Sequence, residues 1–355
     1  MKLAELAEKI GGKVAGDDTV EIRGLRDLEQ IRLHDKTAVP QKGYIYFVES
    51  KKVLNEHPES AQAEAILTIP ALAGSFKNAI VVDAAAPRIA FIQLLQLFES
   101  VPAPMPARAG SFFIAETAKV DPSAIVMHGA VILDNAEIGP RSVIHPNAVI
   151  EQNVKIGSDT VIHPNVVIKY ACVIGDHCII HSATVIGADG FGFYDKDGVR
   201  YKIPQIGNVV VGNHVEMGAH VSVDRATIES TTIGDYTKFD DKVHVGHNCQ
   251  VGKYVYMAGS SNLAGSVTLE DNVIIGGLCA VNNKVTIAKG TLVMGFTGMA
   301  QDSEPGGIYF GIPARPVREM HKINNSLQFL PELLKRVSAL EEKLGIEKES
   351  GEGKK

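Results

Sequence analysis

The sequence predicts a mainly β protein in which a long coil of short, flat faces follows a small α/β domain and precedes a helical tail. Two periods predict the coil. An aliphatic or similar apolar residue recurs at every sixth position in two runs, 114–186 and 233–293. Glycine and histidine recur at every eighteenth position, as in Gly139, Gly157 and Gly175 and in His145, His163 and His181. A helix repeats every 3.6 residues and a strand every two, whereas three six-residue faces make one triangular turn of a coil.

Residues eighteen apart are therefore expected to stack on successive turns, with the sixth-position residue inside. A small or β-branched residue stands two positions before each of these, and it is expected to fit beside a corner. All four cysteines, Cys172, Cys178, Cys249 and Cys279, occupy this small position. We interpret them as buried core residues of a reduced cytosolic protein rather than as disulfide or metal-binding residues.

The chain divides by pattern into five parts. Before the coil, helices are expected at 2–10 and 87–98, and strands at 20–25, 44–48, 65–69 and 79–82. The Asp197-Gly198 pair inside the interruption between the two runs predicts a hairpin. The parts are the α/β domain 1–100, a proline-rich linker 101–110, the coil 111–306, a helical extension 307–346 and an end, 347–355, expected to be disordered.

Composition excludes some classes of function. The net charge of −6 with mixed signs argues against nucleic acid as the main ligand. No apolar run reaches the roughly 18 residues needed to cross a bilayer, and no signal peptide opens the chain, so we expect a cytoplasmic protein without a transmembrane segment. The first domain has no glycine-rich phosphate loop.

The densest polar cluster in the coil runs from Asp240 to Asn248. His247 is expected on the outer surface near a corner, and Asp240 is close enough in sequence to meet its ring around that corner. A carboxylate on one ring nitrogen would fix the tautomer and favour general-base chemistry at the other. Gly265 should stack over His247 and offer its N–H to an oxyanion.

The alternative for any corner histidine is a hydrogen bond to the backbone and nothing more. That interpretation is favoured for His145, His163 and His181, which simply repeat with the coil. It remains open for His244 and, by position alone, for His247.

Several motifs are distinctive: the loop Gly187-Ala-Asp-Gly-Phe-Gly192, the segment Lys202-Ile-Pro-Gln-Ile-Gly207, Val223-Asp-Arg225, Gly246-His-Asn248, and Glu304-Pro-Gly306 with Gly311-Ile-Pro313. In this order along the chain they resemble one family, the bacterial UDP-3-O-acylglucosamine N-acyltransferases of lipid A biosynthesis. The resemblance covers nearly the whole chain. Hexapeptide repeats alone would be weak evidence, because many acyl- and nucleotidyltransferases share them.

The resemblance implies a homotrimer of left-handed parallel β-helices with active sites in clefts between subunits. It implies a 3-hydroxyacyl donor on acyl carrier protein, and an acceptor that is the 2-amine of a UDP-linked, 3-acylated glucosamine. Neither a metal nor a cofactor is implied. His247 would be the general base, Asp240 would assist it, and Gly265 would donate to the oxyanion.

By the same resemblance, the first domain, 1–100, is of uridine-binding type. Asn248 and Lys284 near the base, and Phe47, Ser50 and Lys52 in the first domain, are expected to bind substrate. Lys284 replaces a second histidine of the family pattern. Ser50 and Val53 replace two of the three residues that hold uridine in the family, so the acceptor could be a variant such as a 2,3-diamino sugar. Two alternatives stay open: an O-acyltransferase of the same pathway, against which the first 100 residues count, and a non-catalytic scaffold.

Overall fold

The computed structural model describes residues 1–26, 28, 39–98 and 112–344. The chain forms two compact units, Met1–Ala103 and Pro104–Lys355. The expected linker 101–110 and the expected disordered end 347–355 lie outside the described residues.

The first unit is a five-stranded sheet with helices, in the order β1-β5-β4-β3-β2. Its strands are β1 (Lys13–Ala15), β2 (Gly24–Leu25), β3 (Tyr44–Val48), β4 (Ala65–Thr68) and β5 (Ala79–Val81). Its helices are α1 (Leu3–Lys9), α3 (Lys51–Glu56) and α4 (Pro87–Phe98), with 3-10 turns η1 (Pro58–Gln62) and η2 (Pro70–Ser75). The predicted helices and three of the four predicted strands are confirmed. The strand predicted at 20–25 is wrong for its first part, where Glu21 makes only an isolated bridge to Lys2 and the strand itself is Gly24–Leu25. Strand β1 was missed because it is just three residues long.

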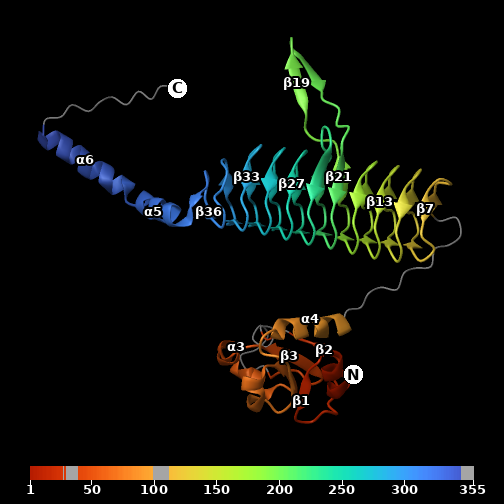
Figure 1. Cartoon of the computed structure of the whole chain (residues 1–355). Helices are drawn as coiled ribbons and strands as arrows, with labels where there is room; N and C mark the ends of the chain where they lie inside the picture. Colours follow the sequence, from red (N-terminus) through yellow and green to blue (C-terminus); the bar gives the residue numbers. More distant parts are fainter. Residues whose placement is uncertain (27, 29–38, 99–111, 345–355) are drawn as a thin grey trace. The chain divides into compact units, whose positions relative to one another are not determined.

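The second unit is a coil whose strands stack in three faces; the strands pair in parallel, except that β37 pairs antiparallel with β36 (Figure 1). The first face holds β7 (Lys119–Val120), β10 (Glu137–Ile138), β13 (Lys155–Ile156), β16 (Val173–Ile174), β21 (Asn208–Val211), β24 (Ser230–Ile233), β27 (Gln250–Val251), β30 (Thr268–Leu269) and β33 (Thr286–Ile287). The second holds β8 (Ile125–Val126), β11 (Val143–Ile144), β14 (Val161–Ile162), β17 (Ile179–Ile180), β22 (Glu216–Met217), β25 (Lys238–Phe239), β28 (Tyr256–Met257), β31 (Ile274–Ile275), β34 (Leu292–Val293), β36 (Ile308–Phe310) and β37 (Arg315–Pro316). The third holds β6 (Phe113–Ile114), β9 (Val131–Ile132), β12 (Val149–Ile150), β15 (Val167–Ile168), β18 (Val185–Ala188), β23 (Ser222–Asp224), β26 (His244–Val245), β29 (Asn262–Leu263), β32 (Ala280–Val281) and β35 (Gly298–Met299).

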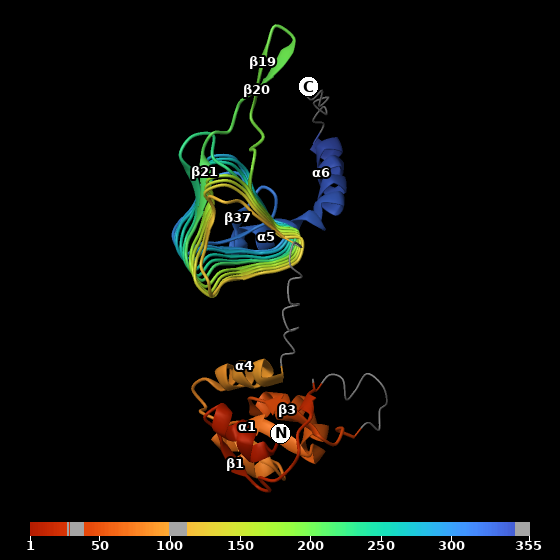
Figure 2. The same ribbon diagram turned by 90° about the vertical axis from the view of Figure 1, so that its right-hand side faces the viewer.

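The predicted stacking is confirmed by the strand register. Ile138 pairs with Ile156, which is eighteen positions later, and Ile156 pairs with Ile174. The second residue of most of these strands is buried in one continuous core, and all four cysteines lie in that core as free thiols. Seen along its axis, the coil is triangular (Figure 2). The parallel β-helix with an α/β domain before it and helices after it therefore agrees with the predicted fold class.

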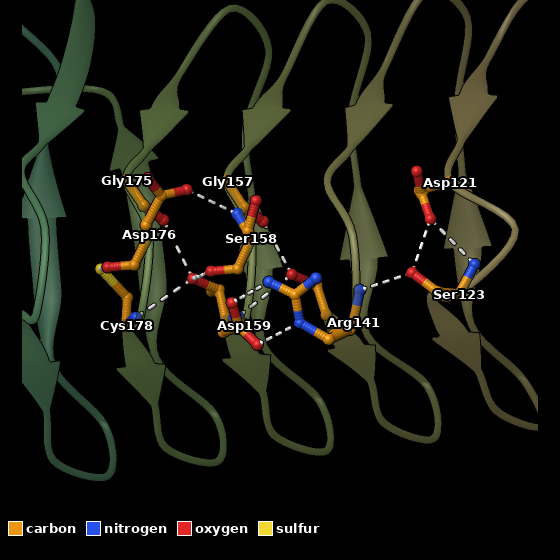
Figure 3. A network of polar contacts seen from close by, with 11 residues as sticks. Asp121, Ser123, Arg141, Gly157, Ser158, Asp159, Gly175, Asp176 and Cys178 are labelled. Atoms are coloured by element: carbon orange, nitrogen blue, oxygen red, sulfur yellow. Dashed lines mark hydrogen bonds and ion pairs between the residues drawn. The ribbon is translucent and has the colours of Figure 1, made fainter.

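Polar side chains at the corners hydrogen-bond from one turn to the next (Figure 3). Arg141 donates from Nε to Oδ1 of Asp159, 2.7 Å away, and the Ser158 N–H donates to Oδ1 of Asp176 at 2.6 Å. These bonds satisfy the backbone and side-chain groups that a tight corner leaves without a strand partner. The corners thus keep successive turns in one register, which gives any corner side chain a fixed position.

The coil is interrupted once by a projecting arm, residues 188–206, which carries the hairpin β19 (Phe193–Lys196) and β20 (Val199–Lys202) (Figures 1 and 2). Its turn is the predicted Asp197-Gly198 pair, with φ of 52° and 77°. Both values are positive, as a type I′ turn requires. The predicted slip after Val223 is also present, because Asn208 pairs with Ser230 rather than with a residue eighteen positions on.

After the coil, the chain forms α5 (Val317–Leu327) and α6 (Leu330–Leu344). Strands β36 and β37 lie within the range predicted to be helical extension, so the helices begin only at Val317. The apolar side chains along one face of α6, Leu334, Val337, Leu340 and Leu344, are exposed. Within the described ranges, no helix is long and apolar enough to cross a membrane.

Candidate active site at a coil corner

His247 follows β26, at the corner where the third face of the coil turns into the first. Its ring lies between two glycines. A Cβ atom on Gly265 would stand 2.5 Å from His247 Nε2, and one on Gly190 would stand 2.6 Å from His247 Cβ. Gly265 belongs to the next turn and Gly190 to the start of the arm. Both glycines are therefore required by the close approach of the imidazole.

The side chain of Asn248 fixes the tautomer of His247. His247 Nδ1 lies 3.0 Å from Asn248 Oδ1, which also accepts the Thr227 N–H at 3.0 Å. The amide group of Asn248 donates from Nδ2 to the Ile228 carbonyl at 3.1 Å, which sets its orientation. Since Oδ1 can only accept, Nδ1 of His247 carries the proton and Nε2 keeps a free lone pair. The substrate contact expected of Asn248 stays a prediction; the partners of its side chain in this structure belong to the protein.

Gly265 stacks on His247 as predicted, because the N–H of Ser266 donates to the His247 carbonyl at 2.8 Å. The N–H of Gly265 itself donates to no acceptor among the residues that the structure describes. Gly265, whose N–H has no acceptor among the described residues, therefore packs against the Nε2 side of the imidazole. A backbone donor close to a base is what an oxyanion requires.

Asp240 lies elsewhere. It follows β25 at the corner between the second and third faces, whereas His247 is one corner further along the chain. Its Oδ2 accepts the Gly259 N–H at 2.9 Å, and its Oδ1 accepts the Asp241 N–H at 2.8 Å. The expectation that Asp240 meets the imidazole around the corner of its own chain is wrong, because the face formed by β26 separates the two corners.

The groove beside Asp240 has a volume of about 510 Å³. Gly259, Gly277 and Gly295 form its floor on successive turns, and Leu278 and Phe296 line it with exposed apolar side chains. The absence of side chains at three stacked positions leaves this corner open.

Asp224 is the carboxylate that the structure places near His247 within one chain, and the sequence analysis did not select it. It ends β23, is 6% exposed, and has Oδ2 at 3.8 Å from His244 Nε2. Burial raises its pKa to about 6, and His244 and His247 act in the opposite direction when their rings are protonated. The only signal in the sequence was its place in the Val223-Asp-Arg225 motif. The eighteen-residue spacing could not find it, because the turn that follows is longer.

Lys284 lies on the same corner, one turn beyond Gly265, to whose carbonyl its N–H donates at 3.1 Å. Its side chain is exposed.

The three expected binding residues of the first unit lie in or just after β3. The Phe47 ring is stacked on Phe91 of α4, with centroids 4.6 Å apart and the planes inclined by 8°. Ser50 Oγ accepts the Val53 N–H at 3.3 Å and thereby caps α3. Lys52 is exposed, and its Nζ lies 3.8 Å from Oε1 of Glu56. One face of Phe47 is thus covered by the protein, and the Ser50 hydroxyl already has a structural partner.

The repeated histidines behave as parts of the coil. His145, His163 and His181 are stacked, with ring centroids 5.0 and 4.7 Å apart, and burial lowers the pKa of His145 and of His163. Burial also raises the pKa of the Cys249 thiol to about 12, so this thiol is unsuited to act as a nucleophile. In the described ranges, no group of three or more metal-binding side chains is gathered in one place.

Comparison with known proteins gives matches over the coil and over the whole chain. The model of the bacterial transferase hexapeptide family (six repeats) matches residues 114–152 and 153–188. A UDP-3-O-acylglucosamine N-acyltransferase of Pseudomonas aeruginosa (strain LESB58) is 33% identical over 351 residues, which are 99% of this chain and 96% of the relative. Its counterpart in Methylobacterium sp. (strain 4-46) is 37% identical over 145 residues, 41% of each chain. Among solved structures, a UDP-N-acetylglucosamine acyltransferase from Campylobacter jejuni is 27% identical, with a TM-score of 0.45 over 56% of this chain and 73% of its own.

Proposed function

The chain belongs to the family of UDP-3-O-acylglucosamine N-acyltransferases, and on that premise we propose that it moves a 3-hydroxyacyl chain from acyl carrier protein to the 2-amine of a UDP-3-acyl-glucosamine in lipid A biosynthesis. One observation carries the proposed mechanism. Asn248 fixes the tautomer of His247, and Gly265, whose N–H has no acceptor among the described residues, packs against the Nε2 side of the ring. A base and an oxyanion donor at one point are what direct acyl transfer needs.

The reaction runs without a covalent enzyme intermediate. The acceptor amine attacks the thioester carbonyl, and His247 Nε2 takes the proton that the nitrogen loses as the C–N bond forms. The Gly265 N–H donates to the oxygen of the tetrahedral intermediate. When that intermediate collapses, the C–S bond breaks and the imidazolium returns a proton to the leaving thiolate, so atoms and charge balance. No metal or cofactor takes part in these steps.

Two carboxylates support the imidazolium in this proposal. Asp224 of the same chain faces His247 and, when ionised, favours the protonated ring. Asp240 can approach an imidazole only from another copy of the chain, because its own His247 lies at a different corner. This requirement supports an assembly in which corners of neighbouring copies meet, and a homotrimer of left-handed coils satisfies it. We propose that the trimer works in the cytoplasm.

Substrate groups remote from the reaction are assigned to the remaining polar residues. Lys284, exposed on the His247 corner, is assigned to the phosphate of the donor's pantetheine arm. Phe47, Ser50 and Lys52 are assigned to the nucleotide of the acceptor. Since Phe47 is already stacked on Phe91, only its other face is available to a base.

His247→Ala tests the proposal directly. The variant should lose at least about 100-fold in the rate of acyl transfer from acyl carrier protein to a UDP-aminosugar, because a general base contributes that much. His177→Asn is the control, since His177 is another corner histidine of the coil; its φ is 55°, a conformation that asparagine accepts. Undiminished transfer by His247→Ala would favour a scaffold without catalysis.

The acceptor is tested by comparing 3-O-acyl and 3-N-acyl UDP-sugars with a hydroxyl acceptor. Turnover of either amine substrate supports N-acyl transfer. Turnover of the hydroxyl acceptor alone would favour the O-acyltransferase of the same pathway, and inertness toward both amines contradicts the proposal.

A further inference from the structure

Both ends of the arm are tied to the coil by one side chain, that of Arg225. Its Nε donates to the Gly187 carbonyl at 2.8 Å, and its Nη1 donates to the Gly207 carbonyl at 3.0 Å. Gly187 and Gly207 are the residues at which the arm leaves the coil and returns to it. A third bond runs from Nη2 to the Tyr170 carbonyl, 2.8 Å away on the turn below.

Arg225 has no exposed surface and is one of the largest fully buried side chains. A guanidinium stays charged, and a buried charge is costly unless it is fully hydrogen-bonded. Here no carboxylate forms an ion pair with it within the part of the chain that the structure describes. Its partners are the three carbonyls and the Tyr170 ring, whose centroid lies 3.6 Å from Cζ. Only the fork of an arginine can reach three carbonyls from three segments at once.

The arm held in this way contacts His247 by two routes. Gly190, near its start, packs against the imidazole. Gln205, near its end, is 4% exposed, and its Oε1 accepts the Thr227 hydroxyl at 2.9 Å. The Thr227 N–H in turn donates to Asn248 Oδ1, the atom that accepts the His247 Nδ1 proton. A continuous series of hydrogen bonds therefore leads from the arm to the base.

We propose that Arg225 is a positioning residue for acyl transfer: by fixing both ends of the arm, it holds Gly190 and the Gln205–Thr227 pair where they keep the His247 ring in its working orientation. This inference rests on the proposed function of His247. Arg225 itself touches neither substrate nor the reacting atoms. Loosening the arm leaves the imidazole present but free to turn away from Gly265.

Arg225→Lys tests the proposal, with Arg200→Lys as the matched control. Arg200 allows the same substitution at a different place in the arm: it is exposed and forms an ion pair with Asp195. Arg225→Lys should lower kcat between about 10- and 100-fold, the cost of small misplacements at a site, with KM for both substrates changed less than about twofold. Arg200→Lys should change neither. A kcat within about twofold of wild type in Arg225→Lys, whatever its melting temperature, would overturn the proposal.

A second pair of variants decides the matter if Arg225→Lys does not fold. Thr227→Val removes the hydroxyl that donates to Gln205 and keeps the shape of the side chain, whereas Thr227→Ser keeps the hydroxyl. Loss of one hydrogen bond should lower kcat about fivefold in the valine variant and not in the serine variant. Equal kcat in the two variants counts against the proposal.

Hydrogen–deuterium exchange provides a measurement that does not depend on activity. Arg225→Lys should speed exchange at the base of the arm and also in residues 244–250, where the Asn248 N–H donates to Thr231 Oγ1. Faster exchange confined to the base of the arm would limit Arg225 to a structural role and overturn the inference, with the proposed function intact. If Arg225→Lys speeds exchange at both places but the wild-type protein transfers no acyl group, the proposed function is refuted and the coupling between the arm and residues 244–250 stands.

Discussion

His247 Nδ1 lies 3.0 Å from Oδ1 of Asn248, the next residue in the chain. Neighbouring side chains on a strand point to opposite faces, so such a pair cannot meet on a flat sheet. The corner makes the contact possible, because Asn248 has a φ of 61° and the backbone turns there. Asparagine adopts this left-handed conformation more readily than most residues. The imidazole therefore receives its tautomer from the corner itself, without a carboxylate.

Replacing Asn248 should remove the hydrogen bond that fixes the His247 tautomer while leaving the imidazole itself in place. Asn248→Gly removes the acceptor and accepts the positive φ, so we expect kcat to fall about tenfold with little loss of stability, since a fixed proton on Nδ1 is worth one strong hydrogen bond. Asn248→Asp keeps an acceptor for Nδ1 and should retain more activity than the glycine variant. Steady-state kinetics and melting curves of the two variants check this; equal losses would argue against tautomer control.

A methyl group on Gly265 should displace the base. In Gly265→Ala the new Cβ would stand 2.5 Å from His247 Nε2, so the ring must move away from the oxyanion donor. We expect kcat to fall about 100-fold, as for a displacement of about 1 Å, while the fold is kept because the ring can yield. The control is Gly74→Ala, where a Cβ meets nothing within 4 Å. Full activity of Gly265→Ala, measured as kcat, would exclude the proposed geometry.

The buried carboxyl group of Asp224 should make stability depend on pH. Its pKa is raised from 3.8 to about 6, chiefly by burial, so the folded protein binds this proton more tightly than the unfolded chain does. Its contribution to stability is therefore largest below pH 3.8 and is lost as the pH rises through about 6. Asp224→Asn should stabilise the protein at pH 7 by up to roughly 3 kcal/mol, at about 1.4 kcal/mol per pKa unit, and by nothing below about pH 4.

Thermal melts of wild type and Asp224→Asn between pH 4 and 7, at one protein concentration, measure this difference. The concentration must be fixed because oligomers melt at temperatures that depend on it. A difference that does not change with pH would show that the carboxyl is not buried in its charged form.

Mixed oligomers should show whether Asp240 acts on the His247 of another copy. His247→Ala and Asp240→Asn chains are each expected to be impaired. When the two are co-expressed and assembled together, some interfaces contain an intact His247 from one chain and an intact Asp240 from the other. We expect activity of the mixture above the average of the two separate variants. Activity no higher than that average would place both residues in a site within one chain, or remove Asp240 from the mechanism.

Counting residues was sufficient to predict much of the molecule. The six-residue period predicts which side chains are buried, and the eighteen-residue period places Gly265 on His247. Both succeed because every turn of the coil repeats the same backbone path, so register follows directly from position in the sequence. The hairpin at Asp197-Gly198 was likewise predictable, because positive φ at two successive residues strongly selects such pairs.

The sequence alone thus determined the coil, its core and the corner where His247 lies. Only the tertiary structure decided which groups surround that histidine. Asp240 is seven positions away in sequence and yet lies at another corner, while Arg225 ties the ends of an arm that counting cannot place. The physical reason is that the period ends wherever the chain leaves the coil or lengthens a turn. Beyond those points, buried charge and hydrogen bonding determine the contacts, as they do for Asp224 and Arg225.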